Sequence, residues 1–294
     1  MRKSLINKRQ YTCCPKPGNG HVLPTNKICG QKPPGYRIAG GNESAPNEFP
    51  WMALLLYKIR LSPRQELVPK CAGSLITTRY ILTAAHCIDN ATYSDFDLRS
   101  VRLGEHDLST KIDCVTLRNG KQLCSPPHVD IEVEKVILHE AYKNTTSYEN
   151  DIGLVRVISP VTYTDVIKPI CILENHISLA NSILQIAGWG RKENQEKTEV
   201  LLRAYIKEER YYCWGKPDFL PQTEICAGGQ NGEDTCVGDS GGPLMATIGR
   251  GEEEVVYAAG ITSHGYENYK CGEVPAIYTK TGVFYKWIKQ HLRP

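Results

Sequence analysis

Three short segments hold the residue types that nucleophilic catalysis requires. A serine hydroxyl is a weak nucleophile that needs an adjacent base, and a third group can orient that base. A histidine beside a cysteine is by itself more often a core residue, and an aspartate that opens a strand is usually a cap or a turn. Their occurrence together favours a joint chemical role. The segments are Leu82-Thr-Ala-Ala-His-Cys87, Asn150-Asp-Ile-Gly-Leu-Val155 and Gly238-Asp-Ser-Gly-Gly-Pro243.

The serine lies in a glycine-rich stretch, residues 232–244, in which four of thirteen residues are glycine. Glycine loses more conformational entropy on folding than any other residue. A run of it therefore marks backbone in an unusual conformation, or backbone that another group approaches closely. A surface turn is the alternative, because Gly, Asp and Ser are turn formers.

The elements that must position these segments have the pattern of short strands. From Arg37 onward, runs rich in Ile, Val, Leu and Tyr alternate with turn residues, which is typical of an all-β barrel or sandwich. Residues 208–214 favour a short helix, and residues 283–292 a clearer one with Val283, Trp287, Ile288 and Leu292 on one face. The expected strands are Trp51–Tyr57, Ser74–Ile76, Tyr80–Ala85, Ile131–Leu138, Ile152–Val157, Leu184–Ala187, Val255–Ile261 and Ala276–Thr279.

Composition indicates a secreted, extracellular protein. The 294-residue chain has twelve cysteines, and disulfides persist in oxidising compartments. Three N-glycosylation sequons begin at Asn42, Asn90 and Asn144. The net charge is only +3 and the charges are scattered, which argues against nucleic acid and lipid partners, and no apolar run is long enough to span a membrane. The first ten residues lack the apolar core of a signal peptide, so we expect that the natural N-terminus is missing.

The order His, Asp, Ser in these motifs resembles the chymotrypsin-like (trypsin-family) serine proteases, and it differs from the subtilisin-like and α/β-hydrolase orders. The resemblance runs from about Ile38 to Pro294. It implies an all-β fold of two antiparallel six-stranded β-barrels with a C-terminal helix. Residues 1–37 are then a light-chain remnant and linker, and 38–294 the protease domain. Barrel 1 is expected at about 38–160, barrel 2 at about 161–280 and the helix at 283–292.

The resemblance also assigns roles to the three motif residues. Ser240 is the expected nucleophile, and His86 the base that takes its proton and later protonates the leaving amine. Asp151 is expected to hold the imidazole in the required tautomer and to stabilise the imidazolium. The backbone N–H groups of Gly238 and Ser240 form the expected oxyanion hole.

A second aspartate in the same stretch, Asp239, has a different expected role. Tyr36-Arg-Ile-Ala-Gly-Gly41 resembles the activation site of trypsin-like zymogens. Cleavage after Arg37 is expected to free the α-amino group of Ile38, which then pairs with Asp239. Neither charge can be buried alone without a cost of several kcal/mol. The alternative is that Arg37 belongs to an exposed basic linker.

The resemblance predicts cleavage of the substrate after Arg or Lys. Asp234 is the expected floor of the primary pocket, with the Thr235 hydroxyl beside it, and a solvated loop aspartate is the alternative. Ser263 and Gly265 are expected to pair with the substrate backbone as a short antiparallel strand. Two residues depart from the family pattern: His264 replaces an aromatic, which makes the second subsite more polar, and Ala276 replaces a glycine, which narrows the pocket.

The family pattern suggests five disulfides, which the sequence alone does not decide. One family bridge is absent, and Leu184 and Ala246 stand in its place. Cys13 and Cys14 cannot easily bridge each other and are left without their usual partners. The expected pairs are Cys29–Cys171, Cys71–Cys87, Cys114–Cys124, Cys213–Cys226 and Cys236–Cys271.

The loop at 114–124 and the segment Tyr11-Thr-Cys-Cys-Pro15 resemble the clip-domain serine proteases of arthropods, with only the last two of six clip cysteines present. The loop from Glu105 to Asp113 resembles the family's calcium loop. Ca²⁺ prefers oxygen ligands, and the expected ones are the carboxylates of Glu105 and Asp113 and the carbonyls of Asp107 and Thr110. Chelation is then expected to lower stability, and an acidic solvated loop is the alternative.

The sequence therefore predicts a secreted zymogen of a trypsin-like endopeptidase that acts in an extracellular cascade such as Toll signalling or melanisation. No cofactor is expected for catalysis. The expected partners are protein substrates (a protease zymogen, prophenoloxidase or a cytokine precursor), an upstream trypsin-like activator and a serpin-type inhibitor. The alternatives are a non-catalytic clip-domain homologue that acts as a binding cofactor, and a digestive trypsin.

Overall fold

The structure is a computed structural model. It describes residues 22–32, 43–62, 66–116, 120, 122–143, 148–174, 179, 182–190, 198–217, 219–229, 234–236, 238–266 and 269–294. The predictions for Arg37 and Ile38, for the sequons at Asn42 and Asn144, and for Cys13 and Cys14 lie outside these residues.

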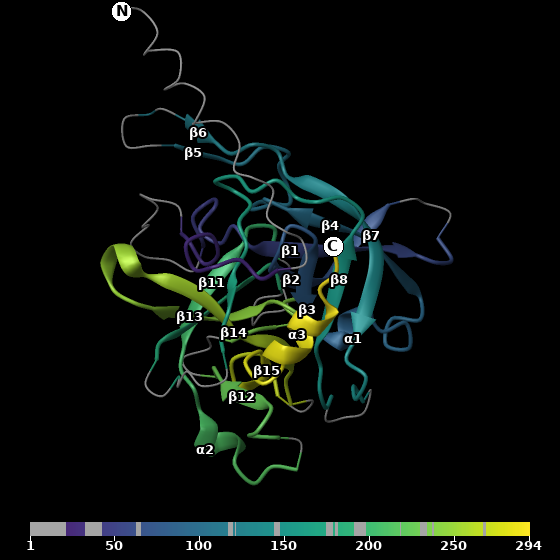
Figure 1. Ribbon diagram of the computed structural model, residues 1–294, viewed down its shortest axis with the longest axis vertical. Coiled ribbons are helices and arrows are strands. Elements are labelled where there is room, and N and C mark those ends of the chain that lie inside the picture. Colours follow the sequence, from purple (N-terminus) through teal and green to yellow (C-terminus); the bar gives the residue numbers. More distant parts are fainter. Residues whose placement is uncertain are drawn as a thin grey trace, which may run out of the picture.

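The first barrel is a closed antiparallel sheet of six strands in the order β1-β2-β3-β8-β7-β4 (Figure 1). Alternation decides which side chains enter its core: in β7, Ile131 is buried while Asp130 and Glu132 are exposed, because successive side chains point to opposite faces of a strand. The strands are β1 (Met52–Ile59), β2 (Leu67–Leu75), β3 (Tyr80–Thr83), β4 (Phe96–Leu103), β7 (Val129–Leu138) and β8 (Gly153–Val157).

The second barrel is built from a sheet in the order β11-β10-β13-β14-β15-β12, with β9 paired to β14. A bridge between Glu208 and Ala227 joins the chain just beyond β11 to β12, which brings the two ends of this sheet together. The predicted chymotrypsin-like fold is thereby confirmed. The strands are β9 (Cys171–Ile172), β10 (Leu184–Gly188), β11 (Leu202–Ile206), β12 (Glu224–Ala227), β13 (Pro243–Ile248), β14 (Val255–His264) and β15 (Ala276–Lys280).

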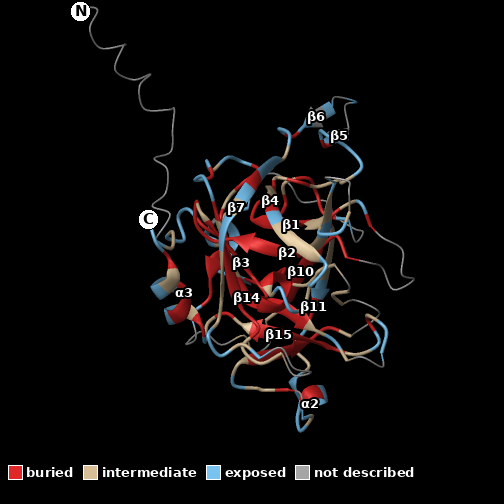
Figure 2. Ribbon diagram, turned by 90° about the vertical axis from the view of Figure 1, so that its right-hand side faces the viewer, coloured by how far each residue is buried: buried red, intermediate tan, exposed pale blue. Residues whose placement is uncertain are grey.

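One apolar cluster continues from the first barrel into the second, and Figure 2 shows the buried residues concentrated along the middle of the molecule. Trp51, just before β1, is fully buried, and its indole N–H donates to the sulfur of Met245 in β13 at 3.3 Å. The two barrels therefore share a core, and burial of that apolar surface holds their facing loops together.

Leu184 and Ala246 stand where the family's missing bridge would lie. They are opposite each other in the β10–β13 ladder, and both are buried. Apolar packing thus replaces a covalent link at this point.

The remaining elements are short. They are α1 (Ala85–Ile88), α2 (Arg210–Cys213), a 3-10 turn at Gly251–Glu253, α3 (Tyr285–His291) and a hairpin of β5 (Cys114–Thr116) and β6 (Gln122–Cys124) that lies at the opposite end of the molecule from α2 (Figure 1). None of the helices in the described part of the chain is long and apolar enough to cross a membrane.

The C-terminal helix differs in one detail from its prediction. Trp287, Ile288 and Leu292 are buried as expected, but Val283 is 36 % exposed. The helix begins only at Tyr285, so Val283 lies in the preceding turn, and Phe284 packs into the core instead.

Candidate active site

Strand register brings the predicted base and its orienting carboxylate together. His86 lies in α1 just after β3, and Asp151 lies just before β8. Because β3 and β8 are antiparallel, with Thr83 opposite Gly153, the two residues reach the same edge of barrel 1. Nδ1 of His86 is 2.7 Å from Oδ2 of Asp151, and the backbone N–H of His86 donates to Oδ1 at 2.9 Å.

Asp151 is only 1 % exposed, and barrel 2 encloses it. The Ser263 hydroxyl of β14 donates to Oδ2 at 2.6 Å, and the Thr279 hydroxyl of β15 donates to the Asp151 carbonyl at 2.9 Å. Burial alone would raise the pKa of Asp151, but attraction to His86 and the hydrogen bonds from His86 and Ser263 outweigh it and lower the pKa. The carboxylate therefore stays ionised next to the imidazole.

Ser240 lies where the loop before β13 crosses between the barrels. Its carbonyl accepts from the N–H of Ala72 in β2 at 2.8 Å, and the next N–H, from Gly241, donates to Thr262 of β14 at 2.8 Å. In the described part of the chain no hydrogen bond joins the Ser240 hydroxyl to His86, whose Nε2 is 3.6 Å from Cys87 Sγ. Such contacts are often long before substrate binds.

The backbone around Ser240 leaves two N–H groups available. Asp239 and Gly242 donate to carbonyls within the loop at 2.9 Å each. The N–H groups of Gly238 and Ser240 have no acceptor among the described residues. Gly238 has φ +109°, a conformation that favours glycine. Unpaired backbone N–H groups are one requirement of the predicted oxyanion hole.

Asp239 points away from the nucleophile into a crevice between two glycines of the segment Gly188-Trp-Gly190. Its carboxylate accepts from the N–H groups of Gly190 at 2.7 Å and Cys236 at 2.9 Å. A Cβ on Gly188 would stand 1.9 Å from its Oδ1, so side chains there are excluded. The residue as a whole keeps some solvent exposure, but this carboxylate is enclosed, and burial raises its pKa to about 6. Among the described residues it has no cationic partner.

Asp234 is held from two sides. The N–H of Thr235 donates to its Oδ1 at 2.7 Å, and the Tyr278 hydroxyl donates to the same atom at 3.3 Å. The Thr235 hydroxyl lies 3.2 Å from that of Tyr278. Burial raises the pKa of Asp234 to about 7. A cation that enters this site would stabilise the ionised carboxylate.

The predicted substrate-binding edge lies at the end of β14. Gly265 is exposed, with open space beside it, whereas the Ser263 hydroxyl donates a hydrogen bond to Asp151. The ring of Tyr148 lies between the rings of His86 and His264, at 5.5 and 5.4 Å. Ala276 is buried opposite Ala227, one residue before Gly228, which lies against Asp234.

The structure contains the five expected disulfides, Cys29–Cys171, Cys71–Cys87, Cys114–Cys124, Cys213–Cys226 and Cys236–Cys271. Cys71, His86 and Cys87 lie close together, but the two cysteine sulfurs form a disulfide with each other and therefore cannot bind a metal ion as thiolates. Of the three asparagines that begin sequons, Asn90 lies among the described residues, and it is exposed.

Three of the four expected calcium ligands already have partners. Glu105 lies 3.2 Å from Arg102 Nη1 and 3.0 Å from His128 Nδ1, so it is held against two basic side chains. Asp113 accepts from the Thr110 hydroxyl at 2.7 Å, and the Asp107 carbonyl accepts from the Thr110 N–H. In this arrangement the loop does not fit a calcium ion, because the ion would have to displace these contacts. No step below uses one.

We therefore expect equal thermal midpoints with millimolar Ca²⁺ and with chelator, because Arg102 already supplies positive charge to Glu105. The measurement is a pair of thermal melts of the Ser240→Ala protein, which excludes self-digestion. A midpoint that rises with Ca²⁺ would restore the calcium-loop prediction.

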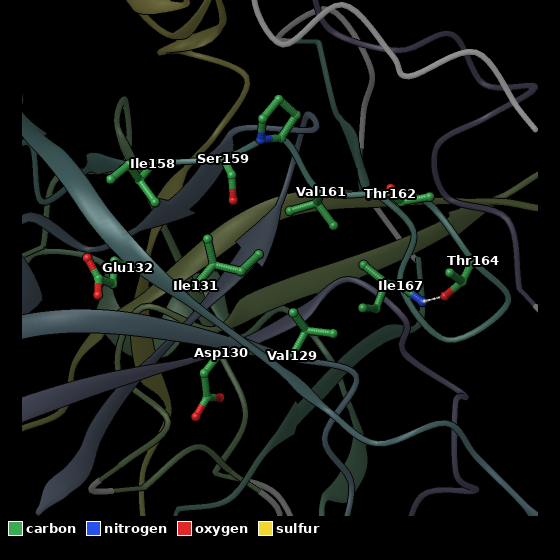
Figure 3. Close-up of a pocket in the computed structure, with 11 residues that line it drawn as sticks. Val129, Asp130, Ile131, Glu132, Ile158, Ser159, Val161, Thr162, Thr164 and Ile167 are labelled. Atoms are coloured by element: carbon green, nitrogen blue, oxygen red, sulfur yellow. Dashed lines mark hydrogen bonds between the residues drawn. The ribbon is translucent and has the colours of Figure 1, made fainter.

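A separate hollow of about 520 Å³ lies on barrel 1, between β7 and the segment 158–167 (Figure 3). Its floor is apolar, with Ile131, Val161 and Ile167 facing one another, and Asp130 and Glu132 lie at its edge. None of its lining residues belongs to the predicted catalytic or specificity sites.

Comparison with known proteins agrees with the geometry. The profile of the Trypsin family matches residues 38–288. The chain belongs to the trypsin family. The protease is 42 % identical to the Spaetzle-processing enzyme of Drosophila melanogaster, over 99 % of this chain and 79 % of that protein. It is 35 % identical to Phenoloxidase-activating factor 3 of Holotrichia diomphalia, over 100 % of this chain and 83 % of that protein.

A solved structure shares this fold. The crystal structure of the Drosophila Grass clip serine protease of the Toll pathway superposes with a TM-score of 0.75 at 33 % identity, over 89 % of this chain and 73 % of that one. The protease is thus related to the clip-domain serine proteases of insects, as the cysteine pattern indicated.

Three residues of the site had no role in the sequence-based prediction. Tyr278 and Thr279 are neighbours on β15, and they contact Asp234 and Asp151 respectively because alternate residues face opposite sides. Tyr148 packs on His86 with φ +43°, an uncommon conformation for tyrosine. A tyrosine just before the Asn-Asp motif was the signal that could have indicated its position.

Proposed function

We propose that this chain is a secreted serine endopeptidase zymogen that is activated by cleavage after Arg37 and then cleaves protein substrates after Arg. The observation that carries the proposal is the buried His86–Asp151 pair beside a loop with two available N–H groups. The family membership supports it, because trypsin-family enzymes use this arrangement for acyl transfer.

In the proposed reaction His86 Nε2 takes the proton of the Ser240 hydroxyl while the serine oxygen bonds to the carbonyl carbon of the substrate's Arg. The carbonyl oxygen gains negative charge and accepts from the N–H groups of Gly238 and Ser240. The imidazolium then protonates the amine, the C–N bond breaks, and the C-terminal part of the substrate leaves. Water, deprotonated by His86, then bonds to the acyl carbon. The ester C–O bond breaks, His86 returns the proton to the Ser240 oxygen, and the N-terminal part of the substrate leaves with a new carboxylate.

The role in a cascade is proposed from the relatives. Their names describe processing of Spaetzle and activation of phenoloxidase. For this chain we propose a comparable protein substrate, namely a cytokine precursor, prophenoloxidase or a protease zymogen. An upstream trypsin-like protease would cut after Arg37, and a serpin-type inhibitor would end the activity. The five disulfides support secretion, because disulfides persist in oxidising compartments.

The test of enzyme function is to cleave the purified chain after Arg37 and offer a chromogenic Arg substrate. We expect turnover only after cleavage, and none in a Ser240→Ala control. An inactive cleaved protein would favour the non-catalytic homologue instead, whereas indiscriminate digestion of unrelated proteins would favour a digestive trypsin.

The activation step predicts a change in stability that depends on Asp239. In the uncleaved chain the pKa of Asp239 is raised to about 6, so the folded state binds more protons than the unfolded state between about pH 4 and 6. Its contribution to the free energy of unfolding therefore falls as pH rises through that window. A new ammonium at Ile38 would lower this pKa and restore the lost stability at neutral pH.

Thermal midpoints of the Ser240→Ala protein, measured at pH 7 before and after cleavage, check this. We expect a higher midpoint after cleavage, by a few degrees or more. The added substitution Asp239→Asn should abolish the gain. An equal gain in that variant would show that Asp239 does not receive the new N-terminus.

A further inference from the structure

A cluster of aromatic and basic side chains projects beside the predicted substrate-binding edge. Helix α2 lies at the far end of barrel 2 from the β5–β6 hairpin (Figure 1), and Tyr211 and Trp214 there are 93 % and 61 % exposed. The ammonium of Lys216 lies between two rings, 3.8 Å from the centroid of Tyr212 and 4.0 Å from that of Tyr266. The guanidinium of Arg210 lies 5.1 Å from the ring of Trp214.

This cluster is anchored. Tyr266 packs on a small core of Cys213, Phe219, Cys226 and Ile277, and the disulfide Cys213–Cys226 closes that core. The rings of Tyr212 and Tyr266 meet edge to face at 6.5 Å. Contact with two rings limits the movement of the Lys216 ammonium, so less conformational entropy is lost when it binds a partner.

The two cations have no carboxylate partner within 4.0 Å in the described part of the chain, although Lys and Arg elsewhere in it often have one. Arg60, Arg79, Arg102 and Arg203 all contact acidic side chains. Among the described residues, Lys216 is therefore a positioned positive charge without an acidic partner.

The direction of the chain after β14 indicates which part of a substrate would lie near Lys216. Ser263 contacts Asp151 at the catalytic end of β14, and the chain runs from there through Gly265 to Tyr266. A substrate strand antiparallel to this segment runs the other way, so its residues that precede the scissile bond lie toward Tyr266. The Arg before the scissile bond is counted as the first substrate residue and lies opposite Ser263. With one substrate residue for each residue of the segment, Tyr266 then lies opposite roughly the fourth substrate residue.

We infer that Lys216, clamped by Tyr212 and Tyr266, is a specificity-determining residue that selects protein substrates with an acidic side chain near the fourth residue before the scissile bond. The inference rests on the proposed function, because it takes Ser263–Gly265 as the substrate-pairing segment. An acidic side chain would gain the charge-assisted contact with Lys216, and a basic one would meet a like charge.

The test uses peptides that end in a chromogenic group after Arg and differ only at the fourth residue, which is Glu, Gln or Lys. For the activated protease at low salt we expect kcat/KM for Glu over Gln of about three- to tenfold. High salt should reduce this ratio, because a partly exposed pair is screened. Lys216→Met keeps the alkyl packing and should bring the ratio to about one, and Lys216→Glu should favour the Lys peptide.

Two controls separate the outcomes. Lys289→Met removes a lysine that lies 5.4 Å from the Tyr285 ring on α3, and it should keep the wild-type ratio. A single-residue Arg substrate should be cleaved equally by wild type and Lys216→Met. If no variant cleaves that substrate, the proposed function fails. If it is cleaved but the Glu preference is absent or survives Lys216→Met, the inference about Lys216 is wrong.

A binding measurement tests the inference even where catalysis fails. Fluorescently labelled peptides with Glu, Gln or Lys at the fourth residue are titrated into the cleaved Ser240→Ala protein. We expect the Glu peptide to bind more tightly than the Gln peptide, and Lys216→Met to remove the difference. Equal affinities for the three peptides would overturn the inference.

Discussion

Asp151→Asn should lower kcat of the cleaved protease by about 10⁴-fold while the protein remains folded, which is the magnitude established for this substitution in the family's type enzyme. The carboxylate accepts from both the backbone N–H and Nδ1–H of His86. An amide can keep only one oxygen as an acceptor. If its NH₂ faces Nδ1, the imidazole must carry its proton on Nε2, and that nitrogen cannot then take the proton of Ser240.

The measurement is kcat on a chromogenic Arg substrate, with circular dichroism to verify folding. Ser263→Ala is the matched control, because it removes a donor to the same Oδ2 and leaves both His86 contacts in place. Its loss should be smaller, about ten- to a hundredfold. An Asp151→Asn variant that retained more than a few per cent of kcat would contradict the assigned role.

Asp234→Ser should reduce kcat/KM for Arg substrates by about 10²–10³-fold, because the substrate guanidinium would then be buried without its counter-ion. The reacting groups are untouched. Hydrolysis of a small uncharged activated ester should therefore change little. Equal loss on both substrates would show a general distortion of the loop rather than a specificity site.

The pH dependence of binding tests the same carboxylate independently of His86 chemistry. The pKa of Asp234 is raised to about 7 by burial, so the free site is increasingly protonated below neutral pH. An arylamidinium inhibitor should bind the cleaved Ser240→Ala protein more weakly as pH falls from 8 to 5. In Asp234→Ser this component of the dependence should vanish.

Short motifs were sufficient for much of the site, because the reaction constrains residue types locally. His86, Asp151 and Ser240 were predicted from segments of about six residues, and the structure places His86 and Asp151 in hydrogen-bond contact. Short apolar runs with turn residues between them favoured an all-β barrel or sandwich, and the family resemblance implied the pair of six-stranded barrels. Strand β4, Phe96–Leu103, was among the strands missed, because its alternation breaks where the neighbours Ser100 and Val101 are both buried beside a register shift.

Contacts between segments that are distant in the sequence could not be predicted from short motifs. The contact of Ser263 with Asp151 joins residues 112 positions apart, and the packing of one barrel against the other decides it, because β14 and β8 belong to different sheets. The acidic loop at 105–113 has the spacing of a calcium site, but Arg102 and His128 reach Glu105 from outside the motif.

The sequence by itself therefore determined the chemistry, the family and the strand-rich fold, because residue type and local periodicity encode them. Only the tertiary structure decided how charges are compensated. The enclosed carboxylates of Asp239 and Asp234 have raised pKa values because barrel 2 excludes water from them. Lys216 stands between two tyrosines because α2, which holds Tyr212, meets the segment after β14, which holds Tyr266. These environments are assembled from separate segments, and their burial and register exist only once the barrels have closed.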